Sequence, residues 1–118
     1  MIDLKPALLS ALADLPACAD VSFAREEFSL PIIVIGDEDG RVYAQADGAP
    51  YLEEAVFSVN IYAASPQALE ALARQADAAL AALGLRRAFQ QDLFDETACA
   101  YRKYLRYRAL LKGDTIYQ

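Results

Sequence analysis

Two kinds of periodicity divide the chain into segments. Between residues 3 and 15 and between residues 65 and 83, apolar side chains recur every three or four positions, which predicts two amphipathic helices. Pro16 ends the first helix, whereas Ser65 caps the second and Gly84 ends it. Apolar runs, or alternating polar and apolar positions, predict five strands, at residues 28–35, 41–46, 51–63, 86–94 and 98–112.

The order of these segments defines the expected fold class. Two short segments rich in glycine, proline and acidic residues, Gly36–Gly40 and Asp47–Pro50, predict tight turns between successive strands. The expected result is an α+β fold in the order α-β-β-β-α-β-β, a two-layer sandwich of a mainly antiparallel sheet with two helices packed on one face. With 118 residues the chain has the size of a single domain, and residues 113–118 are expected to form a flexible tail.

Charged residues are distributed unevenly, although the formal net charge is −6. Residues 1–85 hold thirteen acids and four bases, whereas residues 86–118 hold four acids and seven bases. The negative total disfavours nucleic acid as a partner, because its phosphates would be repelled. An acidic part and a basic part in one molecule are compatible with attraction between copies of the chain, or with a charged partner.

Side chains suited to catalysis or metal binding are few. The chain has no histidine, so the commonest general base is absent and a Ser-His-Asp or Cys-His arrangement is impossible. Cys18 and Cys99 are far apart and predict two reduced, mostly buried thiols of a cytoplasmic protein, with a disulfide as the alternative. No apolar run approaches the roughly 20 residues of a membrane helix. We therefore expect no enzyme activity, no cofactor, no metal ion and no membrane contact.

Clustered carboxylates are the remaining candidates for chemistry. Asp37, Glu38 and Asp39 could hold Ca²⁺ or Mg²⁺, but the other ligands of a calcium loop are missing, and a solvated hairpin turn accounts for the same residues. The pairs Glu26–Glu27 and Glu53–Glu54 could be imagined as an acid and a base. Adjacent residues of a strand point to opposite faces, however, so neither pair is expected to converge on a substrate.

The most unusual feature is one face of the last predicted strand, which carries Arg102, Tyr104, Arg106 and Arg108. Arginine and tyrosine are enriched in protein interfaces, so this face predicts a contact with another protein. Two alternatives stay open. The arginines could pair with carboxylates such as Glu54 on a neighbouring strand, or the face could bind single-stranded nucleic acid.

A particular order of segments carries a family resemblance. An extended strand at residues 51–63 leads into an alanine-rich helix opened by Ser65-Pro66, and then come Leu83–Phe89, Asp92–Phe94 and Tyr104–Arg108. In this order, residues 28–110 resemble small proteins encoded among the tail genes of siphophages and of prophages in gut Firmicutes, the tail-completion or tail-terminator class.

The resemblance implies a structural role on an α/β sandwich. Proteins of that class form rings, commonly hexamers, at the head-proximal end of the tail tube, where they stop tube polymerisation and help to present the tail to the head. The implied partners are further copies of the chain and the tail-tube and head-completion proteins, in the host cytoplasm during assembly and in the virion afterwards. The class brings no active-site residues with it.

Charge complementarity, in turn, leads us to expect Arg102–Arg108 and Asp37–Asp39 near subunit contacts. Two other classes of function stay open. One is a small regulatory domain that dimerises through its sheet and binds a small molecule, and the other is an enzyme that uses carboxylates.

Overall fold

The computed structural model describes residues 5–19, 30–46, 49–96, 99–112 and 115–117. These residues form two helices and six strands, in the order α1 (Lys5–Ala11), β1 (Ala17–Ala19), β2 (Ile32–Ala46), β3 (Ala49–Ala63), α2 (Pro66–Ala82), β4 (Arg86–Asp95), β5 (Ala100–Lys112) and β6 (Thr115–Tyr117). The predicted α+β class is confirmed, because a helical layer packs on a sheet whose strands are mostly antiparallel.

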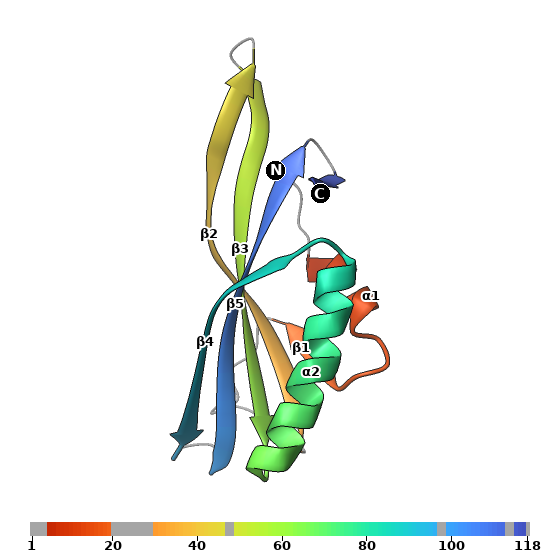
Figure 1. Cartoon of the computed structure of the whole chain (residues 1–118), viewed down its shortest axis with the longest axis vertical. Helices are drawn as coiled ribbons and strands as arrows, with labels where there is room; N and C mark the ends of the chain where they lie inside the picture. The colour runs from red at the N-terminus through yellow and green to blue at the C-terminus, as the bar shows by residue number, and fades with distance from the viewer. Residues whose placement is uncertain (1–4, 20–29, 47–48, 97–98, 113–114, 118) are drawn as a thin grey trace.

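The strands form one sheet in the spatial order β1-β2-β3-β5-β4, and β6 pairs with β5. Only β1 and β2 run parallel among the strand pairs of the described residues. The molecule is elongated, with extents of 51 × 26 × 22 Å. In Figure 1, α2 crosses one half of the twisted sheet and α1 lies beside it, while β2 and β3 extend together beyond the helices. Both described helices therefore cover the same face of the sheet.

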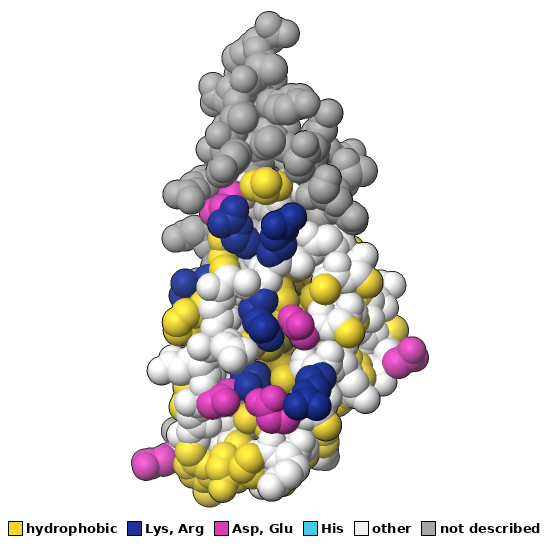
Figure 2. All heavy atoms as spheres, in the orientation of Figure 1, with side chains coloured by type: hydrophobic (Ala, Val, Ile, Leu, Met, Phe, Trp, Pro, Cys, Tyr) yellow, Lys and Arg dark blue, Asp and Glu magenta, His cyan; other side chains and the backbone are white. Residues whose placement is uncertain are grey.

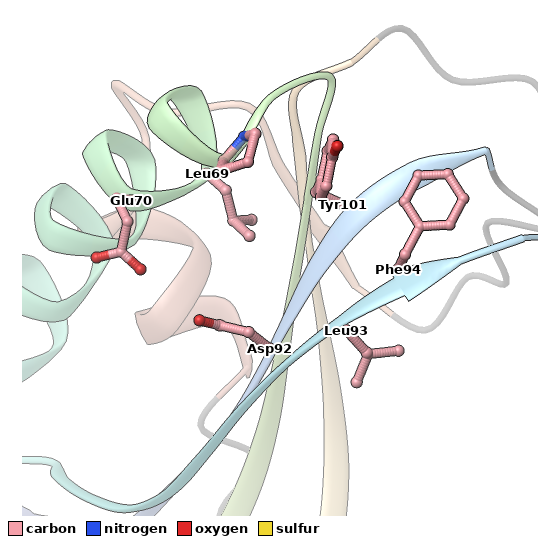
Figure 3. A pocket seen from close by; sticks show the side chains of 7 residues that line it. Leu69, Glu70, Asp92, Leu93, Phe94 and Tyr101 are labelled. Carbon is pink, nitrogen blue, oxygen red and sulfur yellow. The ribbon is translucent and has the colours of Figure 1, made fainter.

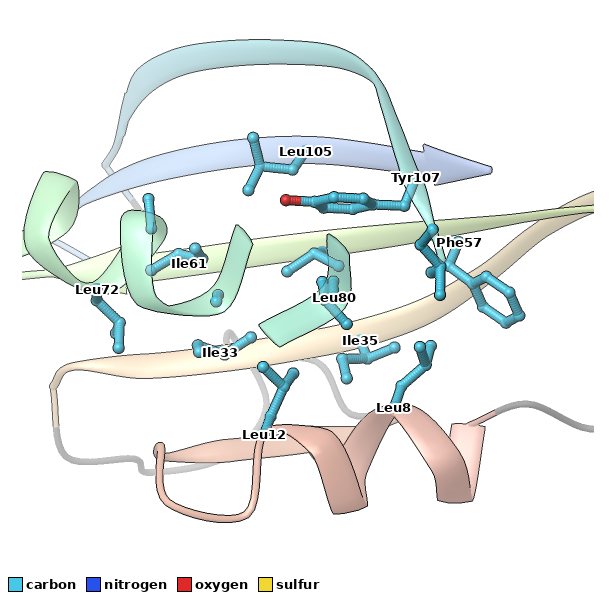
Figure 4. Close-up of a cluster of buried hydrophobic side chains, with 14 of the residues drawn as sticks. Leu8, Leu12, Ile33, Ile35, Phe57, Ile61, Leu72, Leu80, Leu105 and Tyr107 are labelled. Atoms are coloured by element: carbon cyan, nitrogen blue, oxygen red, sulfur yellow. The ribbon is translucent and has the colours of Figure 1, made fainter. Parts of the chain in front are cut away.

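The core lies between the helices and this face. Successive side chains of a strand point to opposite faces, so the odd-numbered residues of β3 and β5 face the helices and the even-numbered ones face away. Figure 4 shows Leu8 of α1 and Leu12, which directly follows this helix, beside Ile33 and Ile35 of β2. The largest side chains with almost no exposed surface are Leu8, Leu12, Ile33, Ile35, Val59, Ile61, Leu80, Leu105, Tyr107 and Leu111.

The helix α2 begins and ends where the sequence predicts. The Ala68 backbone N–H donates to the Ser65 side-chain oxygen at 3.1 Å, and Pro66 occupies the first turn. Gly84, just beyond the helix, has a φ of 97°, a conformation that residues with a Cβ rarely adopt. The predicted apolar stripe is buried at five positions, which are Leu69, Leu72, Ala73, Ala76 and Leu80.

The predicted turn at Gly36–Gly40 is wrong. The chain instead continues through this segment as the single strand β2, which merges the two strands predicted on either side. In the register with β3, Asp37 is opposite Phe57 and Gly40 is opposite Ala55. The chain thus advances by three residues on β2 and by two residues on β3. A bulge thus absorbs one extra residue, and the glycine-rich acidic segment bends the strand without reversing it.

The end of the chain also differs from the prediction. Residues 113–118 were expected to form a flexible tail, but Thr115–Tyr117 form β6 and pair antiparallel with the last residues of β5, Leu110–Lys112. The short strand β1, paired with Ile33–Ile35, is a second addition to the predicted order. Each is only three residues long, too short to show a period of two in the sequence.

A buried tyrosine links the strand β5 to the helix α2 by a hydrogen bond. The Tyr107 ring is buried on the helix-facing side of β5, and its hydroxyl donates a hydrogen bond to the Asp77 carboxylate of α2 at 2.6 Å. Arg87 of β4 approaches the same carboxylate at 3.8 Å. Burial, with help from the hydrogen bond to Asp77, raises the pKa of Tyr107 far above its usual range.

We expect Tyr107→Phe to lower the free energy of unfolding at pH 7 by about 1–2 kcal/mol, because it removes a hydrogen bond to a charged but partly solvated acceptor. The folded protein holds the Tyr107 proton more tightly than the unfolded chain does, so wild-type stability should fall as the pH rises above about 10. Urea titrations at pH 7, 9 and 11 measure both effects. The Phe variant should lose less stability between pH 9 and 11 than the wild type, whereas Tyr101→Phe, at an exposed tyrosine, should behave like the wild type.

Candidate functional site

The predicted arginine–tyrosine face lies on the side of the sheet that the helices leave uncovered. β3 and β5 pair without interruption over eleven residue pairs, from Glu53 opposite Leu111 to Ala63 opposite Tyr101. The core side chains of β5 point towards the helices in this register. Four other side chains of β5 point to the far face of the sheet, namely Arg102, Tyr104, Arg106 and Arg108. Their common face, predicted from alternation, is confirmed.

A bulge in the edge strand adds an aromatic ring to this face. The pairing of β4 with β5 passes from Arg87 opposite Tyr107 to Phe89 opposite Arg106, so Ala88 is an extra residue. Without the bulge, Phe89 would point towards the helices. With it, Phe89 lies beside Arg106 and keeps 43% of its surface exposed. Phe89 is not among the predicted contact residues, because nothing in the local sequence pattern marks the position of the bulge.

Arg106 lies between two aromatic rings. Its guanidinium carbon is 5.4 Å from the centre of the Phe89 ring and 5.8 Å from that of Tyr104. One guanidinium nitrogen donates to the Tyr104 hydroxyl at 3.4 Å. The rings themselves meet edge to face, with centres 5.9 Å apart. An exposed cation is thus held in a fixed position over a small aromatic surface.

Arg108 pairs with a carboxylate of the neighbouring strand, as one of the alternatives predicted. Its guanidinium lies 3.5 Å from the Glu54 carboxylate, whose side chain is only 9% exposed. The arginine itself remains 44% exposed, so its outer edge still faces solvent. This ion pair compensates the charge of a nearly buried Glu54 and leaves surface on Arg108 for a further contact.

Arg102, by contrast, is engaged within the sheet. Its Nε and Nη2 donate to the Asn60 side-chain oxygen at 2.8 and 2.6 Å, and its third nitrogen lies 3.6 Å from Asp95. The guanidinium also covers the Tyr62 ring at 5.6 Å. Burial raises the pKa of Tyr62, which the Arg102 charge partly opposes. Arg102 therefore acts mainly as a brace between β3, β4 and β5.

The other predicted contact residues, Asp37, Glu38 and Asp39, belong to β2, and their side chains lie outside the described part of the structure. Their backbone is opposite Ala55–Phe57 of β3, which in turn is opposite Tyr107–Ala109 of β5. The acidic segment and the arginine face are thus two strands apart in the same molecule, about 10 Å. Their role in a subunit contact stays a prediction.

We define the arginine–aromatic patch as Arg86, Phe89, Tyr104, Arg106 and Arg108. Arg86 is opposite Arg108 in the β4–β5 register and is exposed. The patch holds three arginines, and among the described contacts Arg108 pairs with Glu54.

A groove lies on the helix-covered face, at the other end of β4. It encloses about 350 Å³ between the first turn of α2 and the ends of β4 and β5 (Figure 3), and its lining residues are Pro66, Leu69, Glu70, Asp92, Leu93, Phe94 and Tyr101. Phe94 is 51% and Tyr101 38% exposed, and their rings meet edge to face with centres 5.2 Å apart. We call this region the end groove. In Figure 2 hydrophobic side chains gather at the corresponding end of the molecule, beside mixed charges.

A nearly buried lysine holds the two carboxylates of the end groove. The Lys103 ammonium lies 2.5 Å from Glu70 of α2 and 2.8 Å from Asp92 of β4, with a side chain 4% exposed. Burial alone would lower the pKa of Lys103, but its hydrogen bonds to Asp92 and Glu70 outweigh this and raise it. Glu70 and Asp92 themselves are at least half exposed, so they offer oxygens to solvent at fixed positions.

The remaining candidate residues do not form a reactive centre in the described parts of the chain. Cys99 is a free and exposed thiol, which contradicts the prediction of a buried one. It has a φ of 53° in the segment between β4 and β5. No group of three or more Cys, Asp or Glu residues among the described positions could hold a metal ion. Nor is any described helix long and apolar enough to cross a membrane.

A scan against protein-family models finds no match, and a search of curated proteins finds none either.

The contacts of Lys103 predict which of the charged groups lowers the stability of the fold most when its partners are removed. Lys103→Met leaves two half-exposed carboxylates that water can solvate, so we expect a loss of no more than about 1–2 kcal/mol. The double variant Glu70→Gln, Asp92→Asn leaves a buried ammonium with weaker partners and should cost more, about 3 kcal/mol. Urea unfolding at pH 7 gives both values. Equal losses, or the reverse order, would show that the lysine is more solvated than its position indicates.

Proposed function

We propose that the chain is a structural protein that assembles with further copies of itself, as the tail-completion and tail-terminator proteins that it resembles do. The observation that supports this most directly is the arginine–aromatic patch. It combines exposed arginines with the exposed ring of Phe89 and the half-buried ring of Tyr104, on a sheet face that no described helix covers. These are the residue types that contribute most to protein interfaces.

The geometry of Arg106 suits a contact that excludes water. Cation–π contacts are worth about 0.5–1 kcal/mol at an exposed site and about 2 kcal/mol or more once they are desolvated. The stacking of Arg106 on Phe89 and Tyr104 would therefore strengthen when a partner covers the patch. Holding the guanidinium in place beforehand also reduces the entropy lost on binding.

The positive charge of the arginines favours one type of symmetry over another. A two-fold contact brings the same patch of both copies together, and two positive patches would repel one another. A contact between two different surfaces avoids this repulsion, and it generates a ring when the rotation closes. A ring of this kind, meeting tail-tube and head-completion proteins in the host cytoplasm and later in the virion, is the assembly that we propose.

Reversal of one charge in the patch tests the proposal. Sedimentation velocity in low salt should show wild-type particles larger than a monomer, and higher salt should dissociate them, since the attraction is electrostatic. Arg106→Glu should weaken the association at least tenfold, because a carboxylate would then replace the guanidinium at the contact with the partner. A matched control adds the same negative charge on the exposed side of α2 through Gln75→Glu and Ala82→Glu.

The control variant should assemble like the wild type. A wild-type protein that stays monomeric at hundreds of micromolar in low salt would contradict self-assembly. An Arg106→Glu variant that assembles like the control would exclude the patch as the contact surface.

The end groove favours a second candidate, a regulatory domain that binds a small molecule. Its volume of about 350 Å³ is within the range of ligand pockets, and most of its lining is apolar. A thermal-shift screen with small amines and guanidines, the cations that fit its carboxylates and rings, should raise the melting temperature under this candidate. Under the self-assembly proposal, these compounds should raise the melting temperature only slightly at millimolar concentration, because a single small cation makes few of the contacts that a whole protein surface makes.

A further inference from the structure

A contact between unlike surfaces needs a receiving surface that complements the arginine–aromatic patch. The acidic segment Asp37–Asp39 is a poor choice, because its backbone lies only two strands from Arg106 and Arg108 in the same molecule. In a ring each molecule binds two neighbours, and two neighbours could not bind side by side at surfaces this close together. The receiving surface should instead be acidic, partly apolar and distant from the patch.

The end groove has these properties. It exposes two aromatic rings, Phe94 and Tyr101, next to the carboxylates of Glu70 and Asp92. Its charge is net negative, since one lysine faces two carboxylates. In Figure 3 Glu70 and Asp92 point into the gap between α2 and β4, while Phe94 and Tyr101 form the adjoining aromatic surface.

We infer that the end groove of one copy receives the arginine–aromatic patch of the next copy. This inference rests on the self-assembly proposed above and specifies the second half of its interface. Exposed guanidinium groups of the incoming patch stack on Phe94 and Tyr101 and donate hydrogen bonds to the outer oxygens of Glu70 and Asp92.

The positions of the two surfaces suit a head-to-tail contact. Phe89 and Phe94 mark the patch and the groove on the same strand, five residues or about 17 Å apart. The bulge at Ala88 places Phe89 on the face away from the helices, whereas Phe94 faces the helix layer. Because the surfaces lie on opposite faces and at opposite ends of β4, one molecule can use both at once. Each added subunit then presents a new groove and a new patch, as a ring requires.

The groove is organised before binding. Lys103 fixes the positions of both carboxylates through its bonds at 2.5 and 2.8 Å, so these side chains lose little freedom when a guanidinium arrives. The edge-to-face contact of Phe94 with Tyr101 likewise orients the rings. Lys103 also offsets part of the negative charge of Glu70 and Asp92, so the groove does not attract every cation strongly. The aromatic rings then contribute to the selection of the binding partner.

The test begins with a truncation in the groove. Phe94→Ser removes an exposed ring and should weaken self-association at least tenfold in sedimentation velocity, with the melting temperature showing that the variant is folded. Gln90→Ser, on the same face of β4 but outside the groove lining, is the matched control and should assemble like the wild type.

Mixing two defective variants then identifies the contact as one between unlike surfaces. Phe94→Ser keeps an intact patch and Arg106→Glu keeps an intact groove, so each alone should be monomeric. Their equimolar mixture should form a 1:1 heterodimer and stop there, because only one productive pairing exists. A two-fold contact through either surface predicts no such rescue.

Each outcome separates this inference from the proposed function. If the wild type assembles, Arg106→Glu disrupts assembly and Phe94→Ser does not, the groove is excluded while self-assembly stands. If the two variants are both monomeric but their mixture stays monomeric, the pairing of groove with patch is overturned. A wild type that never assembles overturns both proposals. Heterodimers from the mixture, with monomers from each variant alone, support the inference.

Discussion

The unbroken register between β3 and β5 is the constraint on which both surfaces depend. Eleven consecutive pairs fix which side chains face the helices, and a slip of one residue would exchange the two faces of β5. Leu105 and Tyr107 would then leave the core, and arginines would enter it. The burial of these apolar side chains therefore also fixes the arginines on the opposite face, so core packing and surface chemistry are specified by the same pairing.

Charged groups near the sheet serve two separate purposes. Lys103 and Arg102 are enclosed by partners from other elements and connect β4, β5, β3 and α2. Removing Arg102 would leave its partners partly buried, and removing the two carboxylates would leave the Lys103 ammonium buried, so both clusters stabilise the arrangement of the sheet. Arg106 and Arg108 keep exposed surface and contribute less to the fold, since ion pairs and cation–π contacts in solvent are weak. Their stronger interactions need a partner that removes water.

The long periodic elements could be predicted from the sequence, and the irregularities could not. Alternation in β5 and the Ser65 cap of α2 are local signals, so the common face of Arg102, Tyr104, Arg106 and Arg108 followed directly. A bulge depends on the partner strand as well as on its own residues. The local sequence therefore does not predict the position of Phe89, and it predicts a turn at Gly36–Gly40 where the strand continues. The end groove combines α2 with β4, two elements whose contact no local pattern reveals.

The edge strand explains why assembly would use faces and not strand pairing. β4 is a ten-residue edge strand, a length that would readily template pairing with another chain. Its bulge at Ala88 interrupts the row of backbone groups, and its charged residues, among them Arg86, Arg87 and Asp92, disfavour a second strand alongside. These same features build the patch at one end of β4 and supply a carboxylate to the groove at the other. The strand β4 thus resists pairing with a strand of another copy and contributes to both surfaces. Contacts between side chains of two copies are therefore favoured over a sheet that continues from one copy into the next.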